Sequence, residues 1–263
     1  MKIRAIAFNT FAGLVRDKLL IVFCAVFLCV LLLMLGTLSM MKAATEGTDM
    51  PTWIPMIGAI MGLVSGLGSL LAAWAAADAV WSEMKSGTIL AVMARPVRRW
   101  EFLLGKYLGV QMLMAVYVLF LFGMNYLLAW IGSERIQSTP WVLIAYPMVR
   151  YAIYSAMSML LVKALHPVFS FGIVMVVSVL ASMLGPASDL GAFVPAWLRG
   201  AVYAVLPSTD LLSETRFLTI TQARLKLVPW TNHAIALAYG LDYALVFFLL
   251  AVWAFRRRGL VRN

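Results

Sequence analysis

Long apolar stretches separated by short polar ones dominate this sequence. Crossing the hydrocarbon core of a bilayer as a helix takes about 20 consecutive apolar residues. Six stretches are long enough, and we interpret each as one transmembrane helix: residues 19–41, 53–77, 107–131, 141–162, 167–184 and 234–255. The fourth and fifth are nearly fused, but together they exceed the length of one span, and Pro167 indicates a break between them. The pattern predicts an all-α, polytopic membrane protein with one transmembrane domain over residues 1–263.

Two segments outside these spans also carry helical patterns. In residues 1–18, Ile3, Ala7, Phe11 and Leu14 recur at helical spacing between basic ends, which predicts a helix lying on the inner membrane face. The alternative is an ordinary flank of the first span. A signal peptide is not expected, because the apolar run that follows is too long and lacks a convincing cleavage site. In the outer segment 185–230, the apolar stretches are too short to span, and short surface helices are expected there.

Charge is sparse and unevenly distributed. Of the 263 residues, 63% are hydrophobic and only 12% are charged, about half the charged fraction of a soluble domain. Fourteen of the 21 Lys and Arg residues fall in the two termini and in segments 83–106 and 163–166. Positively charged loops stay on the cytoplasmic side, so both termini and residues 83–106 are predicted to be cytoplasmic. Orientation alone explains the net charge of +10, and no nucleic-acid partner is expected.

The segment 83–106 is the most charged part of the chain between two spans. It holds five cations and two acids, so it is too polar for hydrocarbon and too long for a tight turn. Ser86-Gly87-Thr88 is expected to end the helix that arrives from the second span. Arg95-Pro96 marks another break, because the residue before a proline disfavours helical geometry. Short helices folded at the membrane surface would offer a soluble partner a rigid surface to contact.

These residues carry a resemblance to a known family. Glu83, Ser86-Gly87-Thr88, Arg95-Pro96-Val97, Arg99 and Gly105-Lys106 resemble the signature between spans two and three of ABC-2-type transporter permeases. Residues 1–18 are similar to the family's elbow helix, residues 194–214 to its extracellular helices, and residues 255–258 to its usual ending. Arg98 departs from the pattern, since relatives often have a small hydroxyl residue there.

The resemblance implies a transport subunit without enzymatic activity. Such a subunit, an exporter in a bacterial inner or cell membrane, dimerises with itself or a related permease and binds two cytoplasmic ABC ATPase subunits. ATP and Mg²⁺ belong to those ATPases, and this chain binds no cofactor. An accessory protein on the periplasmic or extracellular side is a further implied partner. The sequence agrees with this division of labour, because Gly105-Lys106 runs into Tyr107 and no phosphate-binding Gly-x-x-x-x-Gly-Lys-Ser/Thr loop is present.

The resemblance also implies roles for residues of the charged segment. The coupling helix, which passes ATPase movement to the membrane domain, would lie around residues 83–93. The implied partner-binding residues of the segment are Glu83, Gly87, Thr88, Arg95, Pro96 and Arg99. For the basic residues, including Lys106, an alternative role is anchoring to anionic lipid head groups, worth about 1 kcal/mol each.

Two ionisable residues lie inside predicted spans, where charge is costly and often functional. Arg150 in the fourth span and Asp242 in the sixth lie at similar depths from the outer side, so an ion pair between them is predicted as a clamp or outer gate. Asn125 in the third span could join this cluster. The alternative is that Arg150 extends its side chain to the membrane surface.

Small residues recur every four positions in the second span, at Gly58, Gly62 and Gly66. Such a stripe lets helix backbones approach closely, within the subunit or across a dimer. Enzyme hypotheses find little support: there is no set of residues with metal-ligand spacing and no Gly-x-Ser-x-Gly turn. A membrane scaffold or assembly subunit that does not transport is the alternative to a permease.

Overall fold

The computed structural model describes residues 2–17, 25, 29, 53–86, 98–132, 140–183, 195, 212 and 230–257. Within the helices, the side chains of residues 53–63, 86, 124–132, 140–143, 181–183, 230 and 257 lie outside the described part. Most of the first predicted span, most of the outer segment and residues 87–97 also lie outside it.

The described elements are all helices: α1 (Lys2–Val15), α3 (Trp53–Ser86), α5 (Arg99–Gly132), α6 (Pro140–Val162), α7 (Pro167–Met183) and α10 (Trp230–Arg257). The prediction of an all-α protein is confirmed for this part of the chain. The second to sixth predicted spans coincide with α3, α5, α6, α7 and α10. Among described residues, three segments are long and apolar enough to cross a membrane: Val64–Lys85, Arg99–Gly123 and Thr231–Arg256.

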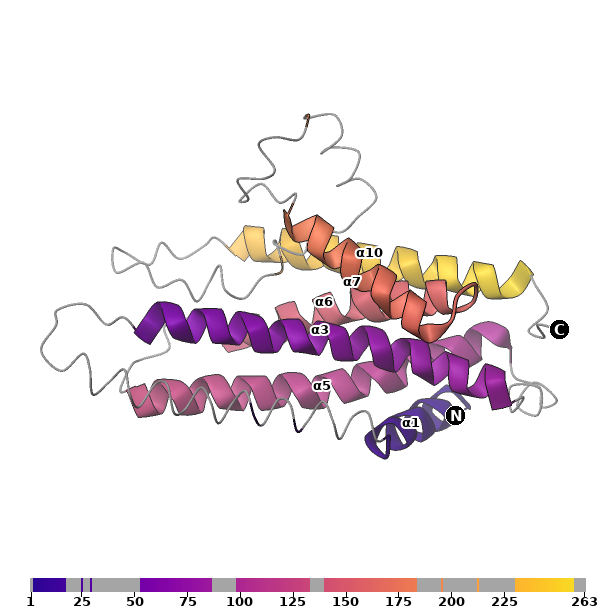
Figure 1. Cartoon of the computed structure of the whole chain (residues 1–263), viewed down its shortest axis with the longest axis horizontal. Coiled ribbons are helices and arrows are strands. Elements are labelled where there is room, and N and C mark those ends of the chain that lie inside the picture. The colour runs from indigo at the N-terminus through magenta and orange to yellow at the C-terminus, as the bar shows by residue number, and fades with distance from the viewer. Residues whose placement is uncertain are drawn as a thin grey trace, which may run out of the picture.

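Helices α3, α5, α6 and α10 lie roughly parallel, and α1 lies across one end of the bundle (Figure 1). The last turn of α3, the first turn of α5 and the C-terminal end of α10 lie at that same end. We call this region the base and define it by residues 2–17, 78–86 and 98–109. The base therefore contains both described ends of the charged segment 83–106, which precede and follow residues 87–97.

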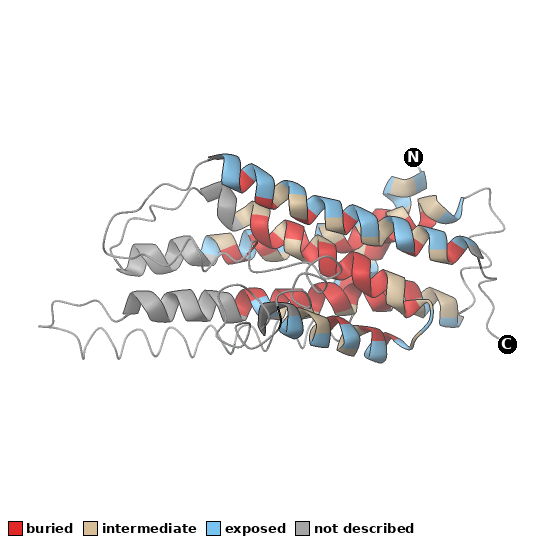
Figure 2. Ribbon diagram, turned by 90° about the horizontal axis from the view of Figure 1, so that it is seen from above, coloured by how far each residue is buried: buried red, intermediate tan, exposed pale blue. Residues whose placement is uncertain are grey.

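Helix α6 forms the centre of the packing. Its side chains Tyr146, Tyr151, Ile153, Met159 and Val162 are fully buried. It packs against α3, α5, α7 and α10, and Figure 2 shows the buried residues concentrated where these helices face one another. Residues 144–162 of α6 are all buried or partly buried, which explains why its apolar residues do not form one narrow stripe.

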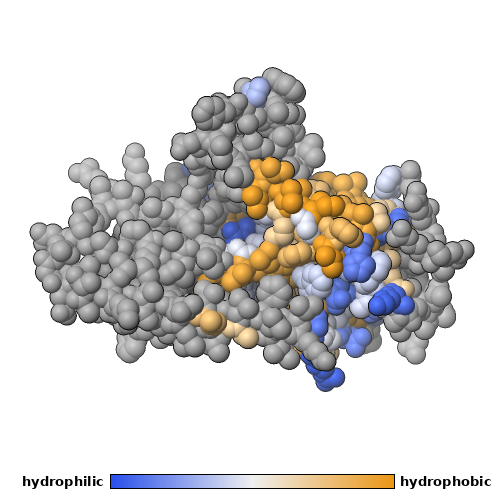
Figure 3. All heavy atoms as spheres, viewed as in Figure 1, coloured by the Kyte–Doolittle hydropathy of each residue, from blue (hydrophilic) through white to orange (hydrophobic). Residues whose placement is uncertain are grey.

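The outward faces of α5, α7 and α10 are apolar. Large exposed hydrophobic side chains include Leu119, Phe169, Val176, Ile235 and Leu245. Figure 3 shows a hydrophobic surface over the bundle and hydrophilic residues gathered toward the base. Contiguous apolar surface on this scale is rare on soluble proteins and is expected where helices face lipid.

The break between α6 and α7 is a short turn at residues 163–166. The backbone N–H groups of Ala164 and Leu165 both donate to the carbonyl of Leu161, which closes the last turn of α6. Pro167 then begins α7, where its fixed φ suits a helix start and its missing N–H costs nothing. The sequence-based division of this region into two helices agrees with the structure.

Candidate functional site at the base of the bundle

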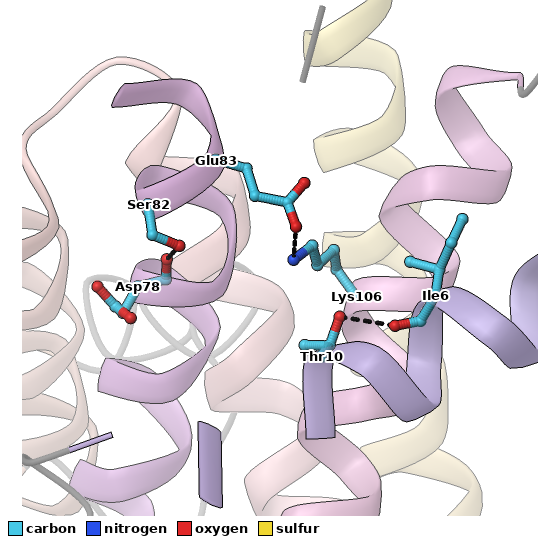
Figure 4. Close-up of polar contacts among 6 residues, drawn as sticks. All are labelled: Ile6, Thr10, Asp78, Ser82, Glu83 and Lys106. Carbon is cyan, nitrogen blue, oxygen red and sulfur yellow. Dashed lines mark hydrogen bonds and ion pairs between the residues drawn. The ribbon is translucent and has the colours of Figure 1, made fainter. Parts of the chain in front are cut away.

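A largely buried ion pair joins α3 to α5 at the base. Lys106 Nζ donates to Glu83 Oε1, and the two side chains point toward each other between the helices (Figure 4). The Lys106 side chain is only 6% exposed and that of Glu83 21%. The ammonium also lies 5.7 Å from the centroid of the Phe102 ring. Removing one partner of such a buried pair typically costs about 3–5 kcal/mol, because the other charge is left without compensation.

Further charges surround this pair. Asp78, about half buried on α3, interacts electrostatically with Lys106 and with Asp17, which follows α1. Ser82 lies between Asp78 and Glu83 in the sequence, and its hydroxyl donates to the Asp78 carbonyl at 2.8 Å. Asp78 therefore experiences repulsion from the like charge of Asp17 and attraction from the opposite charge of Lys106 on α5. In a region of low dielectric constant, such attraction is stronger than at an exposed surface.

Two glycines on α5 form a seat for α1. A Cβ added to Gly105 would lie 2.7 Å from the Cβ of Ile6, and one added to Gly109 would lie 2.7 Å from the Ala7 carbonyl oxygen. Both distances are too short for real side chains, so only glycine allows this approach. Ala7, Thr10 and Leu14 are the buried residues of α1. The Thr10 hydroxyl donates to the Ile6 carbonyl at 2.8 Å, which satisfies its polar group inside the contact (Figure 4).

The sequence reasoning quoted Gly105 as part of a motif but missed this seat. The signal was available, because Gly105-x-x-x-Gly109 places two small residues on one helix face. The predicted helix in residues 1–18 is present as α1. Its exposed residues include Phe8 and Arg4, on the face turned away from α5.

The start of α5 is fixed by its own side chains. The backbone N–H of Arg98 donates to Glu101 Oε2 at 2.9 Å, as in one half of a capping box. Arg99 is exposed overall, yet its Nη1 donates to the Phe255 carbonyl at 3.1 Å. Phe255 lies near the C-terminal end of α10, where carbonyl groups lack helical partners and favour a cation. Arg99 thus joins the start of α5 to the end of α10.

The other predicted residues of the charged segment cannot be placed. Gly87, Thr88, Arg95 and Pro96 lie outside the described residues. Of the six residues assigned to this segment, the structure therefore places Glu83 and Arg99, and both make intramolecular contacts. Lys106 is buried rather than extended toward lipid head groups, which corrects the anchoring alternative for that residue.

The predicted Arg150–Asp242 ion pair is not present in this structure. Arg150 Nη2 donates to the Ser65 hydroxyl of α3 instead, and Asp242 is exposed on α10 without an ion pair to any described residue. Helix α10 meets its neighbours through Ala236, Gly240 and Ala244. Asp242 lies two residues from Gly240, which is about 200° around the helix, so it faces away from α6. The Asn125 side chain lies outside the described part.

Arg150 belongs to a polar cluster between α3, α5 and α6. Its guanidinium lies 5.6 Å from the centroid of the Tyr151 ring, and the Tyr151 hydroxyl donates to the Ser65 carbonyl at 3.1 Å. The Tyr117 hydroxyl of α5 donates to the Val64 carbonyl at 2.8 Å, and its ring meets that of Tyr151 edge to face. These contacts give polar groups partners inside an apolar bundle, which is the condition for placing them there.

The predicted glycine stripe of α3 is only partly described. Gly66 is exposed, and a Cβ added there would meet nothing within 4 Å, so it forms no close contact with the described helices. The surroundings of Gly58 and Gly62 lie outside the described part. The close contact is made by Gly68, where an added Cβ would collide with the rings of Tyr117 and Tyr151. Among the glycines of α3 whose surroundings are described, Gly68 rather than Gly66 makes the close contact.

Both histidines contact aromatic side chains of neighbouring helices. His233 Nδ1 shares a hydrogen bond of 2.7 Å with the Tyr146 hydroxyl, which joins α10 to α6. The His166 ring lies edge to face with Trp81, with centroids 5.0 Å apart. No group of three or more His, Cys, Asp or Glu residues suited to a metal ion occurs among the described residues. The contacts described at the base hold the ends of α1, α3, α5 and α10 in fixed positions relative to one another.

Comparison with known proteins agrees with the motif in segment 83–106. The family model described as "ABC-2 family transporter protein" matches residues 4–260, which is nearly the whole chain. A search among curated proteins found no match. Because the family model covers α1, every described helix of the bundle and the charged segment together, the chain belongs to the ABC-2 family of transporter proteins, as an integral membrane protein.

Proposed function

We propose that the chain is the permease subunit of an ATP-driven exporter and works with a separate cytoplasmic ATPase. The observation that carries the proposal is the family match over residues 4–260 together with the charged segment between α3 and α5. The sequence lacks a phosphate-binding loop, so energy from ATP would have to come from another chain. Two ATPase subunits and a second permease, identical or related, complete the proposed assembly.

The charge distribution supports a cytoplasmic position for the base. Basic residues are concentrated in the termini and in segments 83–106 and 163–166, and such segments remain on the cytoplasmic side of bacterial inner membranes. In this orientation, residues 87–97 are offered to the ATPase, with Gly87, Thr88, Arg95 and Pro96 as proposed contact or hinge residues. Glu83 and Arg99 flank this surface and hold the helices from which it extends.

Purification of the tagged chain from its native membrane in mild detergent tests the proposal. We expect an ATPase with a phosphate-binding loop to co-purify and to hydrolyse ATP in the complex. Gly87→Arg should abolish its co-purification, because a long charged side chain would occupy the proposed contact surface. Ser82→Ala is the matched control, since that hydroxyl only bonds within its own helix. A partner retained without any ATP-dependent activity would favour the scaffold alternative, and the absence of any ATPase would contradict the proposal.

A further inference from the structure

Lys106 is buried too deeply to serve as a contact for a soluble protein. The residue is 5% exposed, and its ammonium is enclosed by Glu83, by the Phe102 ring and by the charge of Asp78. A subunit that docks from the cytoplasm would meet exposed residues such as Arg98. Lys106 therefore acts inside the base, through its contact between α5 and α3.

The ion pair joins the end of α3 to the start of α5, the two helix ends that residues 87–97 connect in the sequence. Glu83 is in the last turn of α3, which is described as far as Ser86, and Lys106 is in the second turn of α5, which begins at Arg99. Residues 87–97 therefore connect two helices whose ends at the base are joined by this ion pair. If α3 moved relative to α5 at this level, the pair would separate, and the buried Lys106 ammonium and the partly buried Glu83 carboxylate would lose their compensation.

The same stretch of α5 seats α1. Gly105 precedes Lys106 directly, and Gly109 follows one turn later, so the ion pair and the α1 seat lie on adjacent positions of the helix. The contact at Gly109 reaches the α1 backbone at the Ala7 carbonyl, rather than the end of a long side chain. Close-packed contacts of this kind transmit displacement because the atoms have little room to move independently.

We propose that Lys106 is a positioning residue that makes the ends of α1, α3 and α5 move as one unit during transport. The inference rests on the proposed function, which supplies the ATPase that acts on residues 87–97. Movement delivered to the end of α3 passes to α5 through the Glu83–Lys106 pair and from α5 to α1 through Gly105 and Gly109. Replacing a buried ion pair by apolar residues is often tolerated by the fold, so the role assigned here is geometric and separate from stability.

Hydrogen exchange of the intact permease–ATPase complex tests this route without modifying the chain. The complex is compared in the nucleotide-free state and after trapping with ATP and vanadate. In the wild-type protein, we expect the exchange of residues 78–86, residues 99–109 and α1 to change together. A change in residues 78–86 that does not reach α1, or the reverse, would overturn the inference even if no variant could be purified.

The variant Lys106→Gln removes the charge while keeping a side chain of similar length. We expect the ATPase to co-purify as before and the nucleotide-dependent change in residues 78–86 to persist. The corresponding change in residues 99–109 and α1 should be lost. Ser82→Ala, one residue from Glu83 but directed away from Lys106, should respond as the wild type does (Figure 4).

A cross-link provides the rescue. In a chain with Cys24 and Cys29 replaced by Ala, the variant E83C/K106C should lose the response of α1, and joining the two thiols with a bismaleimide should restore it. A Lys106→Gln complex that responds like the wild type would overturn the inference and leave the proposed function intact. A wild-type chain that carries no ATPase would instead refute the proposed function, and the inference with it.

Discussion

Gly68 of α3 lies directly against the ring of Tyr151 of α6, so that a Cβ added to the glycine would be 2.6 Å from Tyr151 Cζ. The Tyr151 ring has little room to move away from Gly68, because it is fully buried and its hydroxyl donates to the Ser65 carbonyl. This contact sets how closely the two central helices approach. It also explains why the polar cluster around Arg150 can reach across from α6 to α3.

Gly68→Ala should therefore lower the thermal stability of the protein in detergent. Overpacking a filled interior typically costs about 1–3 kcal/mol. The matched control is Gly66→Ala on the same helix, where an added Cβ has open space. That variant should be neutral or slightly stabilising, because alanine is favoured over glycine in a helix by about 0.5–1 kcal/mol. Unfolding followed by fluorescence-detected gel filtration distinguishes the two, and equal behaviour would contradict the packing described here.

Gly109→Val should loosen α1 from α5. The Ala7 and Thr10 atoms that face Gly109 leave no space for a branched side chain, so α1 must shift outward. The shift can be measured by maleimide labelling of Ala7→Cys in a background without Cys24 and Cys29. Ala7 is 4% exposed, and labelling should be slow in the parent and faster in the Gly109→Val chain.

Phe8→Cys serves as the labelling control, since Phe8 is 64% exposed and should react equally in both backgrounds. Gly123→Val is the control for a valine in α5, because an added Cβ there meets nothing within 4 Å. If Ala7→Cys stays unreactive with valine at 109, the seat is not as tight as described.

Arg150 and Asp242 should behave as independent residues. Arg150 faces α3, whereas Asp242 is exposed on the side of α10 turned away from α6. A double-mutant cycle of Arg150→Ala and Asp242→Ala should therefore show a coupling within about 0.5 kcal/mol of zero. The Arg150 and Ser65 side chains share a hydrogen bond, so Arg150→Ala and Ser65→Ala should couple by about 0.5–3 kcal/mol. Midpoints of thermal unfolding in one detergent provide the comparison. Strong coupling between Arg150 and Asp242 would restore the ion pair that the sequence predicted.

Arg99→Ala should fray the end of α10. The guanidinium that bonds the Phe255 carbonyl is lost, and with it the favourable charge at the helix C-terminus. We expect faster amide exchange in residues 252–257 and unchanged exchange in the centre of α3. Arg98→Ala is the neighbouring control, because the Arg98 contact with Glu101 uses the backbone N–H rather than the side chain. Similar exchange in both variants would argue against a capping role.

The sequence by itself determined where the described helices lie and which family the chain belongs to. Helix location depends on local properties, namely the length of apolar runs and the break at Pro167. The second to sixth predicted spans accordingly coincide with helices. The motif around residues 83–106 agrees with the family match over residues 4–260.

Only the tertiary structure decided which residues meet. Equal depth suggested that Arg150 pairs with Asp242, but the rotation of each helix about its axis depends on packing against all its neighbours, and it turns Asp242 away. The same reason separates Gly68, which is in contact, from Gly66, which is not. The Glu83–Lys106 pair lies 23 residues apart in the sequence, and it forms because α3 and α5 run antiparallel from a common base.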